Sequence, residues 1–320
     1  MASTRINGRA AWMARLSIGN RNRAGERARR GYTLAPMPTF KHEGQRLAYE
    51  VYGEGNRYVV LLPGLLLPSR MHEPLAKELA ARGHRVVTLD LLGHGKSARP
   101  KDMWRYSMQI FAGQVVGLLD YLEIDEAVVG GTSLGANVTL EVASLAPDRL
   151  RGMVIEMPVL DNALLACAVA FTPLLVALTF GEPVVGRLAA ALRRVPRVFS
   201  HYPNVFLDWV SQDPRPSAAV LQGIFHGRTA PHRSERKTFE MPAMVLGHPR
   251  DAIHPFSDAK MLAEELPNGR LIEANSLFEL RFQPQRLTEE ISSFLDECWQ
   301  PRSASAQRPR RRKASAQSTT

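Results

Sequence analysis

This chain contains very little cysteine, the residue that forms disulfides and many metal sites. Only Cys167 and Cys298 occur among 320 residues, and they lie far apart. This spacing indicates neither a disulfide framework nor a metal site. Each thiol is therefore expected to be a small, buried, apolar side chain.

A secretory leader with an apolar core is also lacking, although the chain begins with a basic segment. Residues 1–30 hold eight Arg against one Glu, and residues 301–320 hold five Arg and one Lys with no acid. These two arms account for more than the whole formal net charge of +10, so the body between them is slightly acidic. We expect disordered arms at 1–35 and 301–320, no specific nucleic-acid partner and a cytoplasmic location.

The stretch A-V-V-G-G-T-S-L-G-A-N at 127–137 is the most informative part of the sequence. Its first residues predict a buried strand, and residues 134–145 predict a helix. Between them lies G-T-S-L-G, a full G-x-S-x-G pattern centred on Ser133. In a strand-to-helix turn, this pattern strains the serine backbone and lifts the hydroxyl out of the sheet. The flanking glycines avoid collisions with the neighbouring strand and helix, so Ser133 is the predicted nucleophile.

Three other segments match further landmarks of one family. P-G-L at 63–65 follows an apolar run, D-L-L-G-H-G-K-S at 90–97 fits a D-x-x-G-x-G-x-S loop, and D-A-I-H-P at 251–255 follows another apolar run. From about residue 44 to residue 299, the chain resembles the α/β-hydrolase fold family, in its serine-nucleophile, esterase- or lipase-like branch. The resemblance implies a mostly parallel central sheet flanked by helices.

The order of the predicted elements agrees with that fold class. Strands and helices of about ten to fifteen residues alternate, which is typical of a parallel sheet covered on both faces. The predicted strands include an edge strand at 45–52 and a central strand at 58–62, and a closing amphipathic helix is expected at 284–299. We expect an α/β-hydrolase core at 40–158 and 238–300.

An insertion is predicted between the two parts of the core, at 159–237. Residues 163–180 within it are almost wholly apolar and approach the length of a membrane span, but Pro173 interrupts them. The resemblance implies a helical cap at this point of the chain, so we expect a cap and no membrane span. Its apolar content favours a small substrate with a hydrophobic part.

The resemblance also assigns roles to individual residues. Asp251 falls on the position of the triad acid, and Asp161 is an alternative because some members of the family carry the acid after the preceding strand. The backbone amides of Leu65 and Leu134 fall on the oxyanion-hole positions. Backbone donors do not depend on the identity of the side chain, so the absence of the family's usual His-Gly pair at 63–64 is tolerable.

The catalytic histidine of the family is missing from its usual place. It belongs in the loop after the last strand, here 275–284, and no histidine occurs after His254. A serine hydroxyl needs an adjacent base to become a good nucleophile. His254, three residues after Asp251, is the best candidate. Pro255 biases it towards an extended backbone, which leaves open whether its ring points at Ser133.

Structural roles are expected for several other polar residues. Asp90 is predicted to accept hydrogen bonds from backbone amides in its glycine-rich turn, and His94 to brace that loop. Glu279 and Arg281 replace part of the usual histidine loop. They are expected to be solvated and not to form an ion pair that shapes the site.

Two functions from different classes follow. The first is a serine hydrolase acting on an ester or similar acyl bond, with Ser133 as nucleophile, His254 as base and Asp251 orienting it, and with no metal or organic cofactor. The second is a catalytically impaired protein of the same fold that binds a ligand or partner. The intact serine turn favours the enzyme, because a strained turn of this kind costs roughly 1–3 kcal/mol. The missing histidine favours the binding protein.

Overall fold

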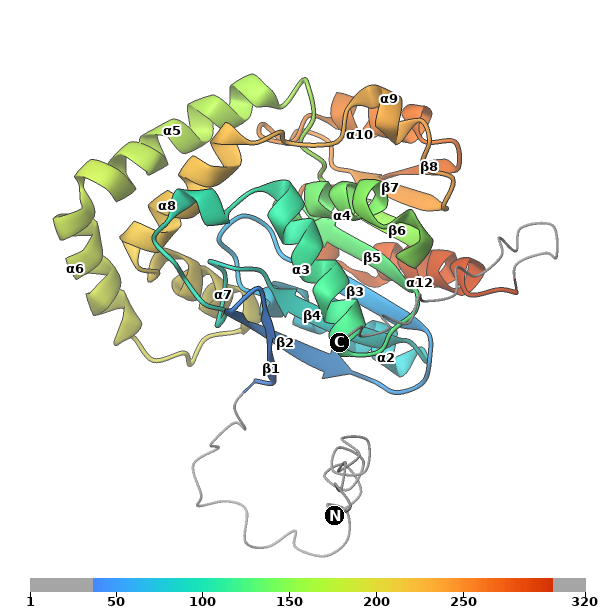
Figure 1. Cartoon of the computed structure of the whole chain (residues 1–320), viewed down its shortest axis with the longest axis horizontal. Coiled ribbons are helices and arrows are strands. Elements are labelled where there is room, and N and C mark those ends of the chain that lie inside the picture. Colours follow the sequence, from blue (N-terminus) through green and yellow to red (C-terminus); the bar gives the residue numbers. More distant parts are fainter. Residues whose placement is uncertain (1–36, 302–320) are drawn as a thin grey trace, which may run out of the picture. The chain divides into compact units, whose positions relative to one another are not determined.

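Alternating apolar side chains build a sheet that is buried on both faces. In β3 (Tyr58–Leu62), Val60 and Leu62 belong to one hydrophobic cluster, whereas Val59 and Leu61 belong to another. Because successive side chains of a strand point to opposite faces, both faces of the sheet need cover. The computed structural model describes residues 37–301 and shows this layered arrangement (Figure 1). The predicted basic arms lie outside the described residues, apart from position 301.

The sheet has eight strands in the order β1-β2-β4-β3-β5-β6-β7-β8. β2 pairs antiparallel with β1 and β4, and all the other pairs are parallel. This confirms the predicted fold class. The remaining strands are β1 (Thr39–His42), β2 (Gln45–Tyr52), β4 (Arg85–Asp90), β5 (Ala127–Thr132), β6 (Leu150–Glu156), β7 (Ala243–Gly247) and β8 (Gly269–Glu273).

The prediction of an edge strand at 45–52 is wrong, because β1 lies outside β2 in the sheet. β1 is joined to β2 by a two-residue turn, Glu43-Gly44, which leaves His42 opposite Gln45. Both turn residues have positive φ, 47° and 76°, as the common tight hairpin turns require. β1 has only four residues, and Phe40 alone is buried, so its sequence carries little signal.

Helices cover the two faces of the sheet. α3 (Met108–Tyr121), α4 (Leu134–Leu145) and α10 (Phe256–Glu265) share a hydrophobic cluster with Val60 and Leu62. On the opposite face, α2 (Glu73–Ala81) and α12 (Gln285–Cys298) pack with Val59 and Leu61. Figure 1 shows α3 and α4 on the near side of the sheet. One further short helix, α11 (Glu279–Phe282), precedes α12.

Five helices lie between β6 and β7, inside the range predicted for the cap. Asn137, one turn after Ser133 in α4, ties both ends of this insertion to the core. Its side chain accepts a hydrogen bond from Val159 N (3.0 Å) and donates to Val159 O (2.7 Å) and Thr229 O (2.8 Å). The insertion is therefore anchored on the helix that begins at Ser133. Its helices are α5 (Leu164–Phe180), α6 (Glu182–Arg193), α7 (His201–Val210), α8 (Pro214–His226) and α9 (Arg233–Arg236).

The apolar segment predicted around 163–180 is one helix. α5 continues through Pro173 and ends at Phe180, where Gly181 begins a sharp bend into α6. Within residues 37–301, no single helix has both the length and the apolar composition needed to cross a membrane. α5 and α6 meet that criterion only as a pair, and the pair is bent by 95°.

Candidate active site

Ser133 occupies a strained turn between β5 and α4. Its φ is 54° and its ψ is −113°, a backbone conformation that is uncommon for a residue with a side chain. The flanking glycines make the turn possible. A Cβ on Gly131 would lie 2.5 Å from the carbonyl carbon of Gly135, and a Cβ on Gly135 would lie 2.4 Å from Leu62 O. The predicted strained turn and the reason for its glycines are both confirmed.

The oxyanion-hole prediction concerns two backbone amides, those of Leu134 and Leu65. Leu134 is the first residue of α4, and the first amides of a helix have no partner within the helix. The turn after β3 is closed by a hydrogen bond from Leu67 N to Gly64 O (3.0 Å), which does not involve the Leu65 amide. A Cβ on Gly64 would lie 4.0 Å from the Cβ of Ser133, so this turn packs directly against the serine.

Ser133, His254 and Asp251 are connected by two hydrogen bonds. His254 Nε2 lies 2.8 Å from Ser133 Oγ, and His254 Nδ1 lies 2.8 Å from Asp251 Oδ2. Because an ionised carboxylate can only accept, Nδ1 carries the proton and donates to Asp251. Nε2 of the neutral ring is then the acceptor for the Ser133 hydroxyl. Ser133 is half-buried and not sealed from solvent.

The loop between β7 and α10 holds both Asp251 and His254. Asp251 Oδ1 accepts from the backbone amides of Ile253 (2.8 Å) and His254 (3.0 Å), which folds this loop around the carboxylate and directs the imidazole towards β5. Burial by itself would raise the pKa of Asp251, but the hydrogen bonds and charge of His254 outweigh it and the net pKa is lowered. Asp161, the alternative acid, is exposed.

A second charged cluster lies beneath the serine turn, at the end of β6. Glu156 accepts hydrogen bonds from Arg281 Nη2 (2.6 Å) and Thr132 Oγ1, and its Oε1 lies 3.2 Å from His248 Nε2. The carbonyl oxygen of Glu156 accepts from Ser133 N (2.9 Å). This cluster of Glu156, Arg281, His248 and Thr132, here called the buried network, holds the backbone at Thr132 and Ser133.

The expectation of a solvated Glu279 and Arg281 is wrong. Arg281 reaches from α11 into the buried network, and its side chain is only 15% exposed. Glu279 is buried and pairs with Arg286 (2.8 Å), and it also accepts from the amide of Asn275. The sequence places both residues in one loop, but α11 turns their side chains to different partners. Arg281 thus contacts Glu156 and Thr132 beneath the serine turn.

Electrostatics keep the buried network ionised. Burial would raise the pKa of Glu156, but Arg281, His248 and Thr132 together hold that pKa well below its ordinary range. Burial by itself would lower the pKa of His248. The contact with Glu156 outweighs burial, so the net pKa of His248 is raised. His72 lies on the other side of Arg281, donates from Nε2 to Leu62 O (2.8 Å), and has its pKa lowered to about 4 by burial and by Arg281.

The turn after β4 has the predicted structural role. Asp90 is buried and accepts hydrogen bonds from the backbone amides of Ser69 (2.6 Å) and Lys96 (2.7 Å). His94 is completely buried, and its Nδ1 lies 3.0 Å from Leu92 O. Burial lowers the pKa of His94 to about 4. A neutral, buried ring of this kind braces the loop, as predicted.

The cap contacts the loops that surround the serine. Gln212, between α7 and α8, donates to Leu66 O in the turn after β3. Tyr202 of α7 packs edge-on against Phe282 of α11, with ring centroids 5.5 Å apart. Cys167 of α5 is buried, and its Sγ lies 3.9 Å from Ile253 O in the loop of the triad acid. The inserted helices therefore contact loops at the carboxyl ends of the strands.

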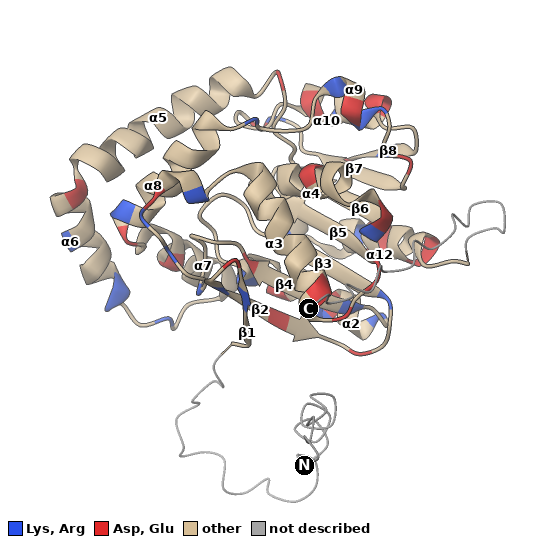
Figure 2. Cartoon of the chain, viewed as in Figure 1, with Lys and Arg blue, Asp and Glu red and all other residues tan. Residues whose placement is uncertain are grey.

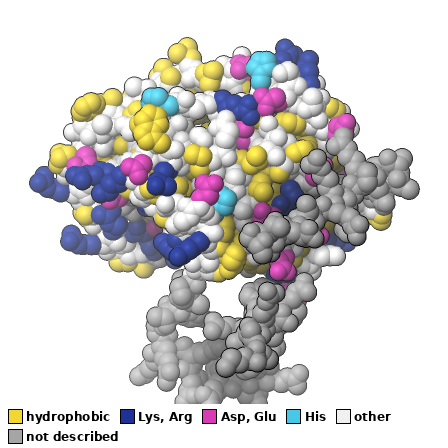
Figure 3. Space-filling view, viewed as in Figure 1, with side chains coloured by type: hydrophobic (Ala, Val, Ile, Leu, Met, Phe, Trp, Pro, Cys, Tyr) yellow, Lys and Arg dark blue, Asp and Glu magenta, His cyan; other side chains and the backbone are white. Residues whose placement is uncertain are grey.

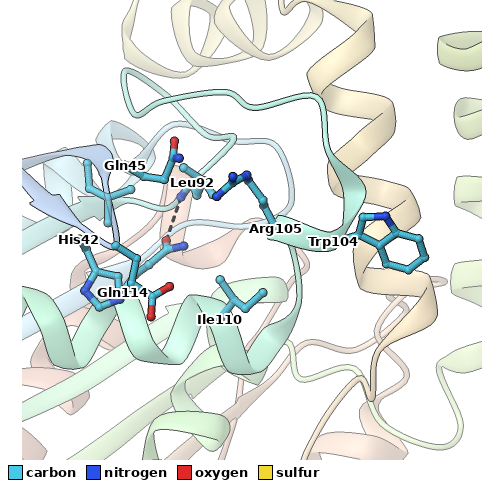
Figure 4. Close-up of a pocket in the computed structure, with 9 residues that line it drawn as sticks. His42, Gln45, Leu92, Trp104, Arg105, Ile110 and Gln114 are labelled. Atoms are coloured by element: carbon cyan, nitrogen blue, oxygen red, sulfur yellow. Dashed lines mark hydrogen bonds between the residues drawn. The ribbon is translucent and has the colours of Figure 1, made fainter.

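A cavity of about 160 Å³ lies elsewhere, between the β1–β2 hairpin and the start of α3 (Figure 4). Gln114 lines it, but the Gln114 side chain is already bonded to Leu92 N (2.9 Å). None of the triad residues lines this cavity. The chemistry is thus expected at Ser133 and not here. The lining residues are His42, Glu43, Gln45, Leu47, Leu92, Trp104, Arg105, Ile110 and Gln114.

Comparison with known proteins agrees with the fold. Residues 58–177 match the family model described as alpha/beta hydrolase fold. In structure, the chain is similar to an enol-lactonase from Burkholderia xenovorans LB400, with a TM-score of 0.66 and 24% identity over 81% of this chain and 100% of that one. At this identity the likeness establishes the fold. The chain therefore has the α/β-hydrolase fold.

Sequence similarity above 35% identity to two curated proteins covers about a third of this chain. It is 36% identical to a zearalenone hydrolase from Bionectria ochroleuca over 113 residues, which are 34% of this chain and 42% of that protein. It is 38% identical to the dihydrolipoyllysine-residue acetyltransferase component of an acetoin cleaving system from Pseudomonas putida, over 37% of this chain and 32% of that protein. The chain thus matches less than half the length of these relatives.

Proposed function

We propose that this protein is a serine hydrolase that cleaves an ester or similar acyl bond of a small, partly hydrophobic substrate. The observation that carries the proposal is the pair of 2.8 Å contacts that link Ser133 Oγ to His254 and His254 to Asp251. Relatives named as hydrolases support it, as does the fold shared with an enol-lactonase, since a lactone is an internal ester. The contact between His254 and Ser133 also removes the main argument for a protein that only binds.

The chemistry begins at the serine hydroxyl. Ser133 Oγ attacks the acyl carbon while its proton passes to His254 Nε2, so that a C–O bond forms and the carbonyl oxygen becomes an oxyanion. The amides of Leu65 and Leu134 would stabilise that charge. His254 then returns the proton to the leaving alcohol as the original C–O bond breaks, which leaves an acyl-serine.

Water completes the cycle by the same route. His254 takes a proton from water, the hydroxide attacks the acyl-serine, and the acid leaves as Ser133 recovers its proton. Asp251 stays ionised throughout and stabilises the imidazolium that forms twice. The net-lowered pKa of Asp251 is consistent with this role. No metal or organic cofactor is needed for any of these steps.

Active-site labelling tests the proposal directly. A fluorophosphonate probe should modify the full-length protein at Ser133, and Ser133→Ala should abolish both labelling and turnover of a short-chain nitrophenyl ester. We expect a loss in kcat/KM on the order of 10⁴-fold or more. Failure of the wild-type protein to label within hours would leave a binding protein of the same fold as the better account.

A further inference from the structure

Helix α5 is apolar on every side but covered on only one. None of its 17 residues carries a charge. Its inner face, with Phe171, Leu174 and Leu178, packs against Ala218 and Leu221 of α8. A helix that is hydrophobic all round is normally buried in a protein core or a membrane. Here the outer face has no cover among the described residues, and it exposes Leu165 (77%), Val169 (69%), Val176 (49%) and Phe180 (82%).

The exposed apolar surface continues from α5 onto α6. Val184 is 69% exposed and Leu188 is 60% exposed, one turn apart on the same side of α6. We call these two residues, together with the four of α5, the cap face: Leu165, Val169, Val176, Phe180, Val184 and Leu188. Both helices lie on the outer rim of the molecule in Figure 1, and Figure 3 shows hydrophobic side chains gathered there. Contiguous exposed patches of this kind mark interaction surfaces.

Positive charge gathers at one end of the cap face. Residues 182–200 contain four arginines and a single acid, Glu182, which pairs with Arg215 (3.1 Å). Arg187 and Arg194 are exposed and lie on one flank of α6. Figure 2 shows α5 free of charged residues and Lys or Arg along the lower part of α6, and Figure 3 shows the same basic cluster beside the hydrophobic rim.

We propose that the cap face docks reversibly on a lipid bilayer that contains anionic headgroups. The apolar side chains of α5 and α6 enter the boundary between headgroups and acyl chains, while Arg187 and Arg194 contact phosphates. Interfacial helices combine these two features, and each arginine near an anionic surface adds to the attraction. The helices lie on the membrane and do not span it, in keeping with the 95° bend between them.

A second copy of the chain suits this face less well. In a twofold contact the same patch meets itself, so the arginines of α6 would approach their own copies. Between residues 182 and 200 only Glu182 could offset them, and it is already paired. Anionic headgroups complement both the charge and the apolar character of the surface.

Vesicle binding by the full-length protein tests the proposal. Sedimentation with phosphatidylcholine vesicles containing about 30% phosphatidylglycerol should recover the wild-type protein. The triple variant Leu165→Ser, Val169→Ser, Phe180→Ser should bind at least about tenfold more weakly, because these side chains supply the buried apolar area. These residues are exposed, so folding should be unchanged, and thermal unfolding checks this.

Leu145→Ser is the matched control. Leu145 is 58% exposed but lies at the end of α4 opposite Ser133, at the amino ends of the strands and outside the cap face of α5 and α6. Its loss should leave vesicle binding unchanged. Arg187→Ser with Arg194→Ser should weaken binding to the anionic vesicles several-fold and leave binding to pure phosphatidylcholine unaltered.

The basic arms could bind anionic vesicles by themselves, so a local probe is needed. A polarity-sensitive fluorophore attached through Leu165→Cys should shift to the blue on adding vesicles, and one attached through Leu145→Cys should not. Both native cysteines are buried. The proposal is overturned if the triple variant binds vesicles as tightly as the wild type. It is likewise overturned if the emission of the fluorophore at position 165 does not shift when vesicles are added. It is also overturned if the wild type forms a dimer that the triple variant abolishes.

Discussion

Asp251–His254 and Glu156–His248 are two carboxylate–histidine pairs beside the serine turn, and of these two only the first contacts Ser133. Asp251 and His254 are 2.8 Å apart, and His254 contacts Ser133. Glu156 and His248 are 3.2 Å apart and more deeply buried, but His248 donates from Nδ1 towards Ser276 O instead. Both pairs consist of an acid and an imidazole near the same turn, so residue type alone does not distinguish them.

The difference between the pairs lies in the third partner. Arg281 contacts Glu156 at 2.6 Å and neutralises it, which makes that carboxylate part of the framework. Within residues 37–301, the ion pair found for Asp251 is the one with His254. Its negative charge is therefore free to stabilise an imidazolium. Glu156, which is paired with Arg281, therefore stabilises the turn. Asp251, which is paired with His254, can instead assist a proton transfer.

The largest effect should separate the two histidines. His254→Gln removes the base and should lower kcat/KM for an ester by about 10³–10⁴-fold. His248→Gln, the matched control, should lower it less than about tenfold, because His248 does not contact Ser133. Steady-state kinetics measure kcat/KM for both variants, and thermal unfolding verifies that both are folded. Equal losses would mean that the contact with His254 is not catalytic.

The next effect should separate the two candidate acids. Asp251→Asn keeps the shape of the side chain but removes the charge that favours the imidazolium, so we expect a loss on the order of 10³-fold in kcat. Asp161→Asn, at the exposed alternative position, should retain wild-type activity. A large loss on changing Asp161 and none on changing Asp251 would reverse the assignment.

Breaking the buried network should affect stability. Arg281→Met leaves the Glu156 carboxylate buried without its main counter-charge and should lower the free energy of unfolding by about 3–5 kcal/mol. The double variant Glu156→Gln, Arg281→Met should recover most of that loss, since no unpaired charge remains. Urea unfolding measures both.

An exposed ion pair provides the control for that experiment. Arg270 and Glu297 are about half exposed and 2.9 Å apart, so Arg270→Met should change the free energy of unfolding by less than about 1 kcal/mol. If Arg281→Met is equally mild, the buried network is not a structural requirement of the serine turn.

Acid should also weaken the frame around the network. Burial lowers the pKa of His72 and of His94 from 6.5 to about 4, so between these pH values the unfolded chain binds protons that the folded chain does not. Their contribution to stability is complete above about pH 6.5 and is lost as the pH falls to about 4. The loss is on the order of 3 kcal/mol for each ring. His248, whose pKa is raised, acts in the opposite direction.

The free energy of unfolding, measured at intervals from pH 7 to pH 4, tests this dependence of stability on pH. His72→Gln keeps a donor for Leu62 O but cannot titrate, so its profile should be flatter by about one proton. A profile identical to that of the wild type would show that His72 is not held neutral by burial.

Local sequence signals predicted much of the core correctly. The helix at 134–145 and the serine turn were predictable because glycine spacing and apolar runs act over a few neighbouring residues. β1 was missed because four residues with one buried side chain give no period. Glu279 and Arg281 were misjudged because their partners lie in α12 and at the end of β6, and no local pattern records such pairs.

The sequence by itself determined the α/β architecture, the position of Ser133 and the choice of Asp251 and His254 as candidates, since these depend on motifs and on short-range spacing. Only the tertiary structure decided the direction of the His254 ring, the pairing of Arg281 with Glu156 and the exposure of the outer face of α5. Each of these depends on which segments the sheet brings together across more than a hundred residues. Backbone preferences act between residues that are close in sequence, whereas the orientation of a side chain depends on the residues packed around it.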